Sequence, residues 1–274
     1  MWVGSLCAGS AFALDLDEVF PVARPNQAEA TAQVVVADAF ANLFDFEGAA
    51  RVESTQQATS GRAQRSVFEI YRKSLRAGER RVLIVTADPE VPAQRIRMLE
   101  VSLSGTPSRT RVFIPRIRPE PMNTSYRITD PFLGTSSNLP AEEVRADLVA
   151  LARAYEIVAR ESGDLEGEPV DRITIRPLAA RRVERVELWL ARDAPLILEY
   201  RYYEGDDPAP ARVVRVPRAE MVAFAGRVLP GLMLYEDRLD GTVTRLELRY
   251  AALPPELGEA PFLESSFHRA VLPE

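Results

Sequence analysis

The sequence is poor in the residues on which many active sites depend. Its 274 residues include one cysteine, Cys7, and one histidine, His268, so no intrachain disulfide can form and a zinc or iron site would rest on carboxylates alone. Lys73 is the only lysine, and the residues around it lack the glycines of a phosphate-binding loop. Neither a glycine-rich dinucleotide fingerprint nor a Gly-x-Ser-x-Gly elbow is present. These absences argue against most enzyme classes and predict a protein without a cofactor.

Net positive charge and long apolar runs are absent as well. The formal net charge is -6 and the isoelectric point is near 5.2, whereas nucleic-acid-binding domains are usually basic, so the sequence disfavours a nucleic-acid partner. No stretch reaches about 18–20 apolar residues, the length that a membrane-spanning helix needs. Hydrophobic residues make up 46% of the chain and charged residues 27%, which is enough for an apolar core beneath a charged surface.

The first residues have the composition of a secretory signal. Residues 3–13 form an apolar, small-residue run that ends in Ala-Phe-Ala, which predicts cleavage after Ala13. The basic segment that normally precedes such a run is missing, so residues 1–13 are predicted to be a partial signal peptide whose start is truncated or miscalled. Two alternatives are a buried helix at 1–13 and lipidation of Cys7, which the large Leu6 before it fits poorly.

Hydrophobic spacing predicts an amphipathic helix followed by many strands. Val36, Phe40 and Leu43 recur at helical spacing within residues 28–44, and Asn26 precedes them as a candidate N-cap. Alternating apolar and polar residues predict strands at 66–72, 80–86, 94–102, 110–114, 182–191, 196–203, 212–216 and 242–250. Because the strands follow one another closely, the pattern favours an antiparallel meander over β-α-β units.

Residues 111–143 combine a strand, a loop and a helix start. The strand ends at Pro115, and a basic, proline-rich loop follows. Further on, the sequence Pro-Ala-Glu-Glu at 140–143 is typical of the first turn of a helix, because proline loses no hydrogen bond there and acidic residues complement the helix dipole. Taken alone, this pattern indicates a strand, a long turn and a helix, and nothing more.

The order of these features resembles the outer-membrane lipoprotein-sorting family of LolA-like periplasmic carriers. The resemblance rests first on a central loop motif, Phe132, Leu133, Gly134 and Thr135. Ser136 and Ser137 follow where the family commonly has Asp-Phe. The resemblance continues in a Leu-Trp-Leu strand, a Pro-Leu turn, a Tyr-Tyr strand, a Leu-Pro pair at 229–230, a Gly-Thr-Val-Thr strand and a closing Ser-Phe pair at 266–267, so that it covers residues 30–270.

The resemblance implies a mainly β (α+β) fold. A strongly curved antiparallel sheet would form an unclosed half-barrel whose concave face is covered by helices, and residues 14–274 would form a single LolA-like domain. The resemblance also implies a strand at 155–161, joined through a turn at 163–167 to a strand at 170–177. Periodicity alone would instead extend the helix at 144–152 to about Arg160. We favour the strand, because Tyr155 and the β-branched residues after it are weaker helix formers than the residues before them.

A concave face that its helices do not fill would leave an apolar pocket suited to an acyl chain. Strand alternation places the following residues on that face: Val186, Leu188, Leu190, Leu198, Tyr200, Tyr202, Leu246 and Leu248. The alternative for each of them is ordinary core packing. The loop arginines Arg116, Arg118 and Arg127 are candidates for contact with a lipid headgroup or with an acidic patch of a partner, the alternative being a solvated basic loop.

The expected function is that of a periplasmic carrier that binds lipid or lipoprotein acyl chains, in outer-membrane lipoprotein or lipid trafficking. Its expected partners are the cargo, an envelope transporter and, transiently, the membrane surface. An alternative is a periplasmic sensor or partner-binding module on the same fold, without cargo transfer. A third class, a secreted hydrolase, would need His268 in a triad, with Ser136 or Ser137 as the nearest serines in a suggestive loop.

Overall fold

The computed structural model describes residues 32–44, 46–58, 61, 63–76, 78–87, 95–103, 109–117, 120–124, 155–178, 183–205 and 207–272. Its helices are α2 (Ala32–Phe44) and the 3-10 helices η3 (Arg218–Glu220) and η4 (Ala260–Phe262). Its strands are β1 (Gly48–Ala58), β2 (Gln64–Arg76), β3 (Glu79–Thr86), β4 (Arg97–Leu103), β5 (Arg109–Phe113), β6 (Met122–Thr124), β7 (Tyr155–Leu165), β8 (Glu168–Pro177), β9 (Val183–Ala191), β10 (Ile197–Glu204), β11 (Arg212–Arg215), β12 (Met221–Phe224), β13 (Arg227–Pro230), β14 (Leu232–Asp237) and β15 (Thr242–Ala251).

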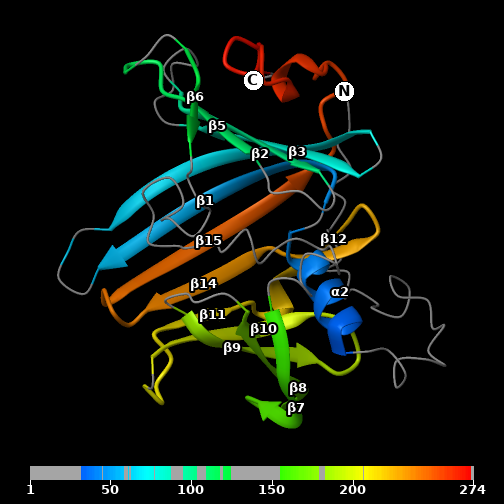
Figure 1. Cartoon of the computed structure of the whole chain (residues 1–274), viewed down its shortest axis with the longest axis vertical. Coiled ribbons are helices and arrows are strands. Elements are labelled where there is room, and N and C mark those ends of the chain that lie inside the picture. Colours follow the sequence, from blue (N-terminus) through cyan, green and yellow to red (C-terminus); the bar gives the residue numbers. More distant parts are fainter. Residues whose placement is uncertain are drawn as a thin grey trace, which may run out of the picture.

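One antiparallel sheet dominates the molecule. It has 13 strands in the order β6-β5-β4-β3-β2-β1-β15-β14-β11-β10-β9-β8-β7, and β12 and β13 form a separate hairpin. Strand β15 pairs with β1 on one side and with β14 on the other, which joins the early and late parts of the chain. In the part of the chain that the structure describes, the edge strands β6 and β7 do not pair with each other, so the sheet curves without closing into a barrel (Figure 1). The expected unclosed half-barrel is confirmed.

The two faces of this sheet are covered differently. We call the face on which α2 lies the inner face and the opposite face the outer face; in Figure 1, α2 lies within the curve and the red C-terminal segment lies above β3. Successive strand residues point to opposite faces, so alternation in the sequence decides which side chains meet. On β2, Phe68 and Ile70 pack into the inner core, whereas Tyr71 packs into the outer one.

The inner core is continuous across nearly the whole sheet. Strands close to both edges contribute to one apolar cluster, from Met98 on β4 to Tyr155 on β7. The predicted apolar stripe of the helix is confirmed, because Val36, Phe40 and Leu43 of α2 are buried in this cluster. The helix is described from Ala32 onward, and the predicted cap at Asn26 and the predicted signal at 1–13 lie outside the described residues.

The outer core is smaller and is covered by the C-terminal segment, residues 252–272. Phe262 and Phe267 from this segment are fully buried against Leu83 on β3 and Leu99 on β4. Backbone carbonyls of the same segment accept hydrogen bonds from outer-face arginines: Arg81 donates to Phe262 O (2.6 Å), Arg97 to Phe267 O (2.9 Å) and Ala270 O (2.6 Å), and Arg111 to Glu264 O (2.9 Å). Apolar burial and hydrogen bonds from the strands therefore hold the C-terminal segment against the outer face of the sheet.

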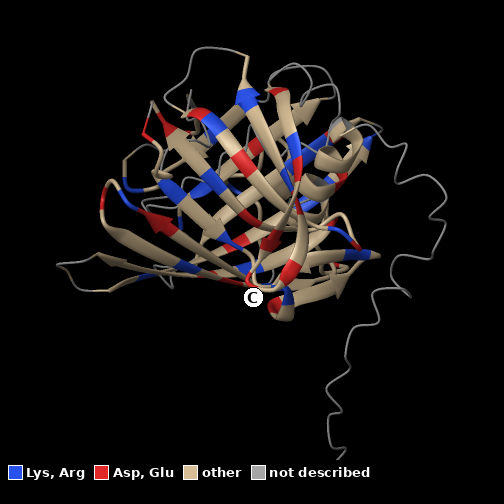
Figure 2. Ribbon diagram, turned by 90° about the horizontal axis from the view of Figure 1, so that it is seen from below, with Lys and Arg blue, Asp and Glu red and all other residues tan. Residues whose placement is uncertain are grey.

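Elsewhere the outer face carries many ion pairs between neighbouring residues and strands. Lys and Arg alternate with Asp and Glu across neighbouring strands (Figure 2). For example, the buried Glu199 on β10 pairs with Arg201 on its own strand and with Arg215 on β11 (3.0 Å). The guanidinium of Arg201 also lies 4.5 Å from the centre of the Trp189 ring. Val186, on the same strand β9, belongs to the inner cluster, as predicted.

The expected hairpin at 155–177 is confirmed in kind and corrected in position. Residues 155–165 are a strand, as favoured above, but the strand continues through Gly163 instead of turning there. Leu165 pairs directly with Glu168, so the turn consists of Glu166 and Gly167 alone. Both turn residues have positive φ (54° and 92°), as a two-residue type I′ turn requires. Gly163 had suggested a turn, but it is a strand residue beside the Trp189 ring, where a Cβ would make an ordinary contact of 3.6 Å.

Strands β12, β13 and β14 were not predicted. The segment at 232–237 reads Leu-Met-Leu-Tyr-Glu-Asp, in which four apolar residues in a row hide the alternation typical of a strand. In the structure both Leu232 and its neighbour Met233 are buried, on opposite faces of the strand. Gly231 lies between β13 and β14, and its N–H donates to Glu220 O at 2.7 Å. A Cβ at Gly231 would stand 2.5 Å from that same oxygen, so only glycine fits this close approach.

Candidate functional site

The inner face of the sheet is the candidate site. All of the residues predicted to line it belong to the inner apolar cluster, and all but the half-buried Leu248 are buried: Val186, Leu188 and Leu190 on β9, Leu198, Tyr200 and Tyr202 on β10, and Leu246 and Leu248 on β15. Strands β9 and β10 pair directly, with Leu188 opposite Tyr200. The structure therefore brings the predicted residues into one contiguous surface.

Helix α2 is fixed to this face at one point by a polar contact. Asn42 is buried, and its Nδ2 donates a hydrogen bond of 3.0 Å to Pro195 O in the turn before β10. The apolar residues of α2 contact β10, β7 and β13. This directional hydrogen bond fixes the C-terminal end of α2 relative to the turn before β10, in addition to the apolar packing.

Hydroxyl groups interrupt the apolar surface near its middle. Tyr235 on β14 lies opposite Thr244 on β15 and opposite Val214 on β11, and all three residues are buried. Burial raises the pKa of Tyr235 well above its usual value, and the neighbouring Tyr200 raises it further, so this phenol stays neutral. Tyr200 and Tyr202 meet edge to face at 5.5 Å. These groups place a few polar atoms within an apolar surface, a mixture that is common in small-molecule sites.

Two residues of this surface were not predicted from the sequence. Met233 and Tyr235 face inward from β14 and belong to the same cluster as Leu246. They were missed because β14 was not predicted. Pairing with the alternating β15, had it been anticipated, would have placed Met233 beside Leu246 and so on the inner face.

The central loop residues fall largely outside the structural description. Phe132, Leu133, Gly134 and Thr135, together with Arg118 and Arg127, lie outside the described residues, as do the predicted helix at 140–152 and both loop serines. Arg116 is described and is exposed in a turn after β5, where Ile117 N donates to Ile114 O at 2.9 Å. The side chain of Ile117 beside it is 68% exposed.

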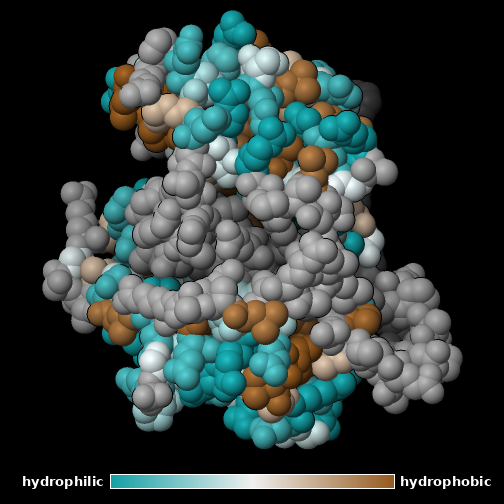
Figure 3. Space-filling model, in the orientation of Figure 1, coloured by the Kyte–Doolittle hydropathy of each residue, from teal (hydrophilic) through white to brown (hydrophobic). Residues whose placement is uncertain are grey.

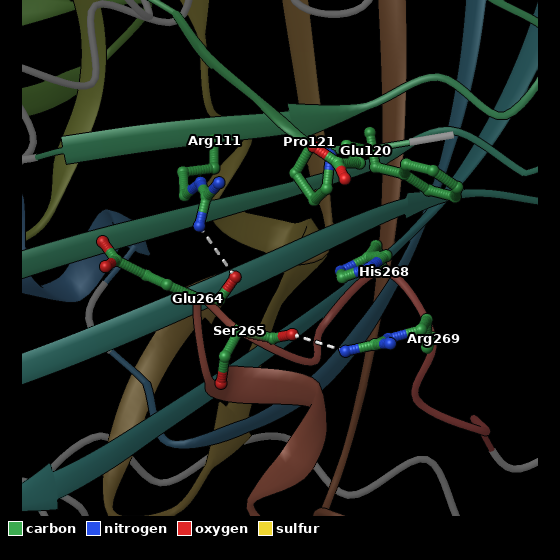
Figure 4. Close-up of a pocket in the computed structure, with 8 residues that line it drawn as sticks. Arg111, Glu120, Pro121, Glu264, Ser265, His268 and Arg269 are labelled. Carbon is green, nitrogen blue, oxygen red and sulfur yellow. Dashed lines mark hydrogen bonds between the residues drawn. The ribbon is translucent and has the colours of Figure 1, made fainter. Parts of the chain in front are cut away.

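A cleft of about 510 Å³ lies on the outer side, between β5, the residues before β6 and the C-terminal segment (Figure 4). It is lined by Arg111, Phe113, Glu120, Pro121, Glu264, Ser265, His268 and Arg269. Desolvation lowers the pKa of His268, and the charges of Arg269, Arg111 and Arg97 lower it further. Its ring packs against Phe113 at 5.4 Å and Phe267 at 5.7 Å. The histidine is therefore held neutral among aromatic rings, an environment typical of packing.

The described residues include neither a candidate metal-ion site nor a candidate membrane-spanning helix. Among these residues, no group of three or more His, Cys, Asp and Glu side chains could hold a metal ion. None of the described helices has the length and apolar character needed to cross a bilayer. On the face drawn in Figure 3, the described surface is mainly hydrophilic, with smaller hydrophobic patches among the polar residues.

Three solved structures share this architecture over most of their length. A DUF1329 family protein from Desulfovibrio piger ATCC 29098 has a TM-score of 0.67 and 17% identity, over 85% of this chain and 97% of that one. An outer membrane lipoprotein-sorting protein domain from Vibrio parahaemolyticus has a TM-score of 0.63 and 13% identity, over 86% and 98% of the two chains. The LolA superfamily protein NE2245 from Nitrosomonas europaea has a TM-score of 0.60 and 14% identity, over 85% and 98%.

No protein-family model and no curated protein matches the sequence. The structural matches nevertheless span nearly the whole of each neighbour, with identities of 13–17%. The chain therefore has the fold of the LolA-like lipoprotein-sorting proteins, as its sequence resemblance implied.

Proposed function

We propose that this protein is a periplasmic carrier that binds the acyl chains of lipid or lipoprotein against the inner face of its half-barrel. The observation that carries the proposal is the apolar cluster that runs from β4 to β7 across an unclosed sheet. A closed barrel of this size would enclose its interior, whereas an open sheet can admit and release a long chain. The fold, shared with a domain described as lipoprotein-sorting, supports the same proposal.

The proposal also covers the domain organisation, the export signal and the partners of the carrier. Residues 14–274 form a single domain, residues 1–13 belong to an export signal, and the protein works without a catalytic centre or a cofactor. The residues that contact the acyl chain are those on the inner face. Cargo would pass to or from an envelope transporter or the membrane surface.

Matched substitutions on opposite faces test the acyl site. Leu248 on β15 and Leu234 on the neighbouring β14 are both half-buried, but Leu248 packs into the inner cluster and Leu234 points to the outer face. We expect Leu248→Gln to weaken binding of a fluorescent C16 fatty acid by about tenfold, because a leucine contact is worth roughly 1.5–3 kcal/mol. Leu234→Gln is expected to leave the affinity unchanged. Equal effects of the two substitutions, or no binding by the unaltered protein, would contradict the proposal.

A second candidate function is that of a partner-binding module on the same fold. The exposed Ile117 beside the exposed Arg116 favours it, because an apolar side chain next to a cation suits contact with an acidic protein surface. We expect reversal of charge at Arg116 and Arg118 to weaken binding of cargo or partner at least fivefold without changing the melting temperature. Pull-down from envelope extracts and thermal unfolding provide the two readouts, and unaltered capture would leave the solvated-loop interpretation in place.

A further inference from the structure

A basic pocket of about 280 Å³ lies where the inner apolar face ends. It is lined by Phe46, Glu47, Arg72, Lys73, Ser74, Arg80, Ala225 and Arg227. Its basic residues come from β2, β3 and β13, and Glu47 is the acidic residue among them. In a chain whose net charge is -6, this concentration of positive charge is local. The outer cleft at His268, in contrast, sets Glu120 and Glu264 against its arginines.

The pocket continues the apolar rows of the inner face. On β2, Phe68 and Ile70 are followed at the same two-residue step by Arg72. On β3, the inward row reads Ile84, Val82 and then Arg80. Ile70 lies opposite Ile84, and Arg72 lies opposite Val82, so the two rows reach their cations at the same end of the sheet. Because two strand residues span about 7 Å, each guanidinium begins one step beyond the last apolar side chain of its row.

Three aromatic rings, those of Phe46, Phe224 and Tyr250, pack together beside Arg72 at this end of the sheet. The Phe46 ring meets Tyr250 at 5.1 Å and Phe224 at 6.3 Å, and the guanidinium of Arg72 lies 5.5 Å from its centre. Gly48 lies beneath the group, where a Cβ would stand 2.9 Å from the Phe224 ring and 2.7 Å from Ala251 O. The tight contact at glycine lets the rings approach the sheet, and the rings in turn restrict the cation above them.

We propose that this pocket binds the phosphate of an anionic amphiphile whose acyl chain lies along the inner face. The inference rests on the proposed carrier function and assigns it a headgroup chemistry. Guanidinium groups form charge-assisted, bidentate hydrogen bonds to phosphate oxygens. The arrangement of an apolar row that ends in a cation, repeated on β2 and β3, matches a molecule with an apolar tail and an anionic end.

Three probes separate the tail from the headgroup. Lysophosphatidic acid carries both, monoacylglycerol of the same chain length carries only the tail, and inorganic phosphate carries only the anion. We expect lysophosphatidic acid to bind at least tenfold more tightly than monoacylglycerol, since one hydrogen bond to a charged group is worth about 1.5–3 kcal/mol, and we expect inorganic phosphate to bind far more weakly than either. The preference should shrink as salt is raised, because half-exposed charges are screened.

Arginine substitutions locate the preference. Arg80→Gln and Arg227→Gln are each expected to reduce it about fivefold or more and to leave monoacylglycerol affinity unchanged. Arg80→Lys is expected to have an intermediate effect, because it keeps the charge but loses the bidentate geometry. Arg245→Gln is the control, because Arg245 is half-exposed on the outer face and pairs with Glu247. Circular dichroism checks that each variant is folded.

Each outcome decides between the claims. Equal affinity for the two acyl probes, or a preference that survives Arg80→Gln and Arg227→Gln, would overturn the headgroup site and leave the carrier proposal standing. Inorganic phosphate binding as tightly as lysophosphatidic acid would overturn it in favour of a free-anion site. Failure of both acyl probes to bind would overturn the carrier proposal itself.

Discussion

Replacing Phe267 with alanine is expected to lower the free energy of unfolding by about 3–5 kcal/mol, the usual cost of removing a large aromatic side chain from a packed core. Phe267 has no exposed surface and packs between the C-terminal segment and strands β3 and β4. The backbone carbonyl that accepts a hydrogen bond from the buried Arg97 is kept in this variant, so the change reports the packing of the ring. Urea denaturation followed by circular dichroism measures the change.

Val271→Ala in the same segment is the matched control. Val271 is 91% exposed, so we expect its replacement to change the free energy of unfolding by less than about 0.5 kcal/mol. If Phe267→Ala cost as little as this control, the C-terminal segment would not be part of the outer core, and the account of that face would be wrong.

Replacing Glu79 with alanine is expected to cost about 3 kcal/mol at pH 7, because it leaves the cation of a buried ion pair without its anion. Glu79 is 2% exposed and accepts hydrogen bonds from Arg76 and from Arg81, whose Nε lies 2.7 Å from Oε1. Arg81 also donates to Phe262 O, so the pair links β3 to the C-terminal segment. Glu247→Ala is the control, because Glu247 and its partner Arg245 are both about half exposed and such pairs contribute about 0–1 kcal/mol.

The Glu79 effect is expected to depend on pH. Burial alone would raise the pKa of the Glu79 carboxyl, but the hydrogen bonds and charges of Arg81 and Arg76 outweigh it and hold the pKa below its ordinary value of 4.5. A carboxyl whose pKa is lower in the folded state stabilises the protein above its unfolded pKa, and this stabilisation is lost as the pH falls through the folded pKa. The gap between wild type and Glu79→Ala should therefore narrow below about pH 4.5. A gap that stays constant from pH 7 to pH 3 would show that the charge of Glu79 contributes nothing.

The sequence predicts the inner face well because that face obeys strict alternation. Apolar residues recur at every second position from 186 to 190 on β9 and from 246 to 248 on β15, and these residues pack into the inner cluster as the pattern predicts. The strand at 155–165 was also recoverable, since its β-branched residues disfavour a helix, although the turn was misplaced: Gly163 looked like a turn residue.

The remaining features depend on residues far apart in the chain. Arg97 and Phe267 are separated by 170 residues, and nothing near either one signals that a guanidinium meets a carbonyl there. The basic pocket likewise combines Arg72, Arg80 and Arg227, which meet only because the β12–β13 hairpin returns beside the β2–β3 turn. Local patterns determine which way a side chain points, but long-range pairing determines what it meets.

Mass spectrometry of the protein and of its organic extract tests the central claim most directly. The protein would be prepared from a periplasmic fraction exposed to its own membranes. The account predicts a stoichiometric acylated molecule, lipid or lipopeptide, in the extract and a matching mass increment on the native protein. A folded protein that carries no acylated molecule and also refuses acyl ligands in vitro would contradict the carrier proposal and favour the partner-binding module.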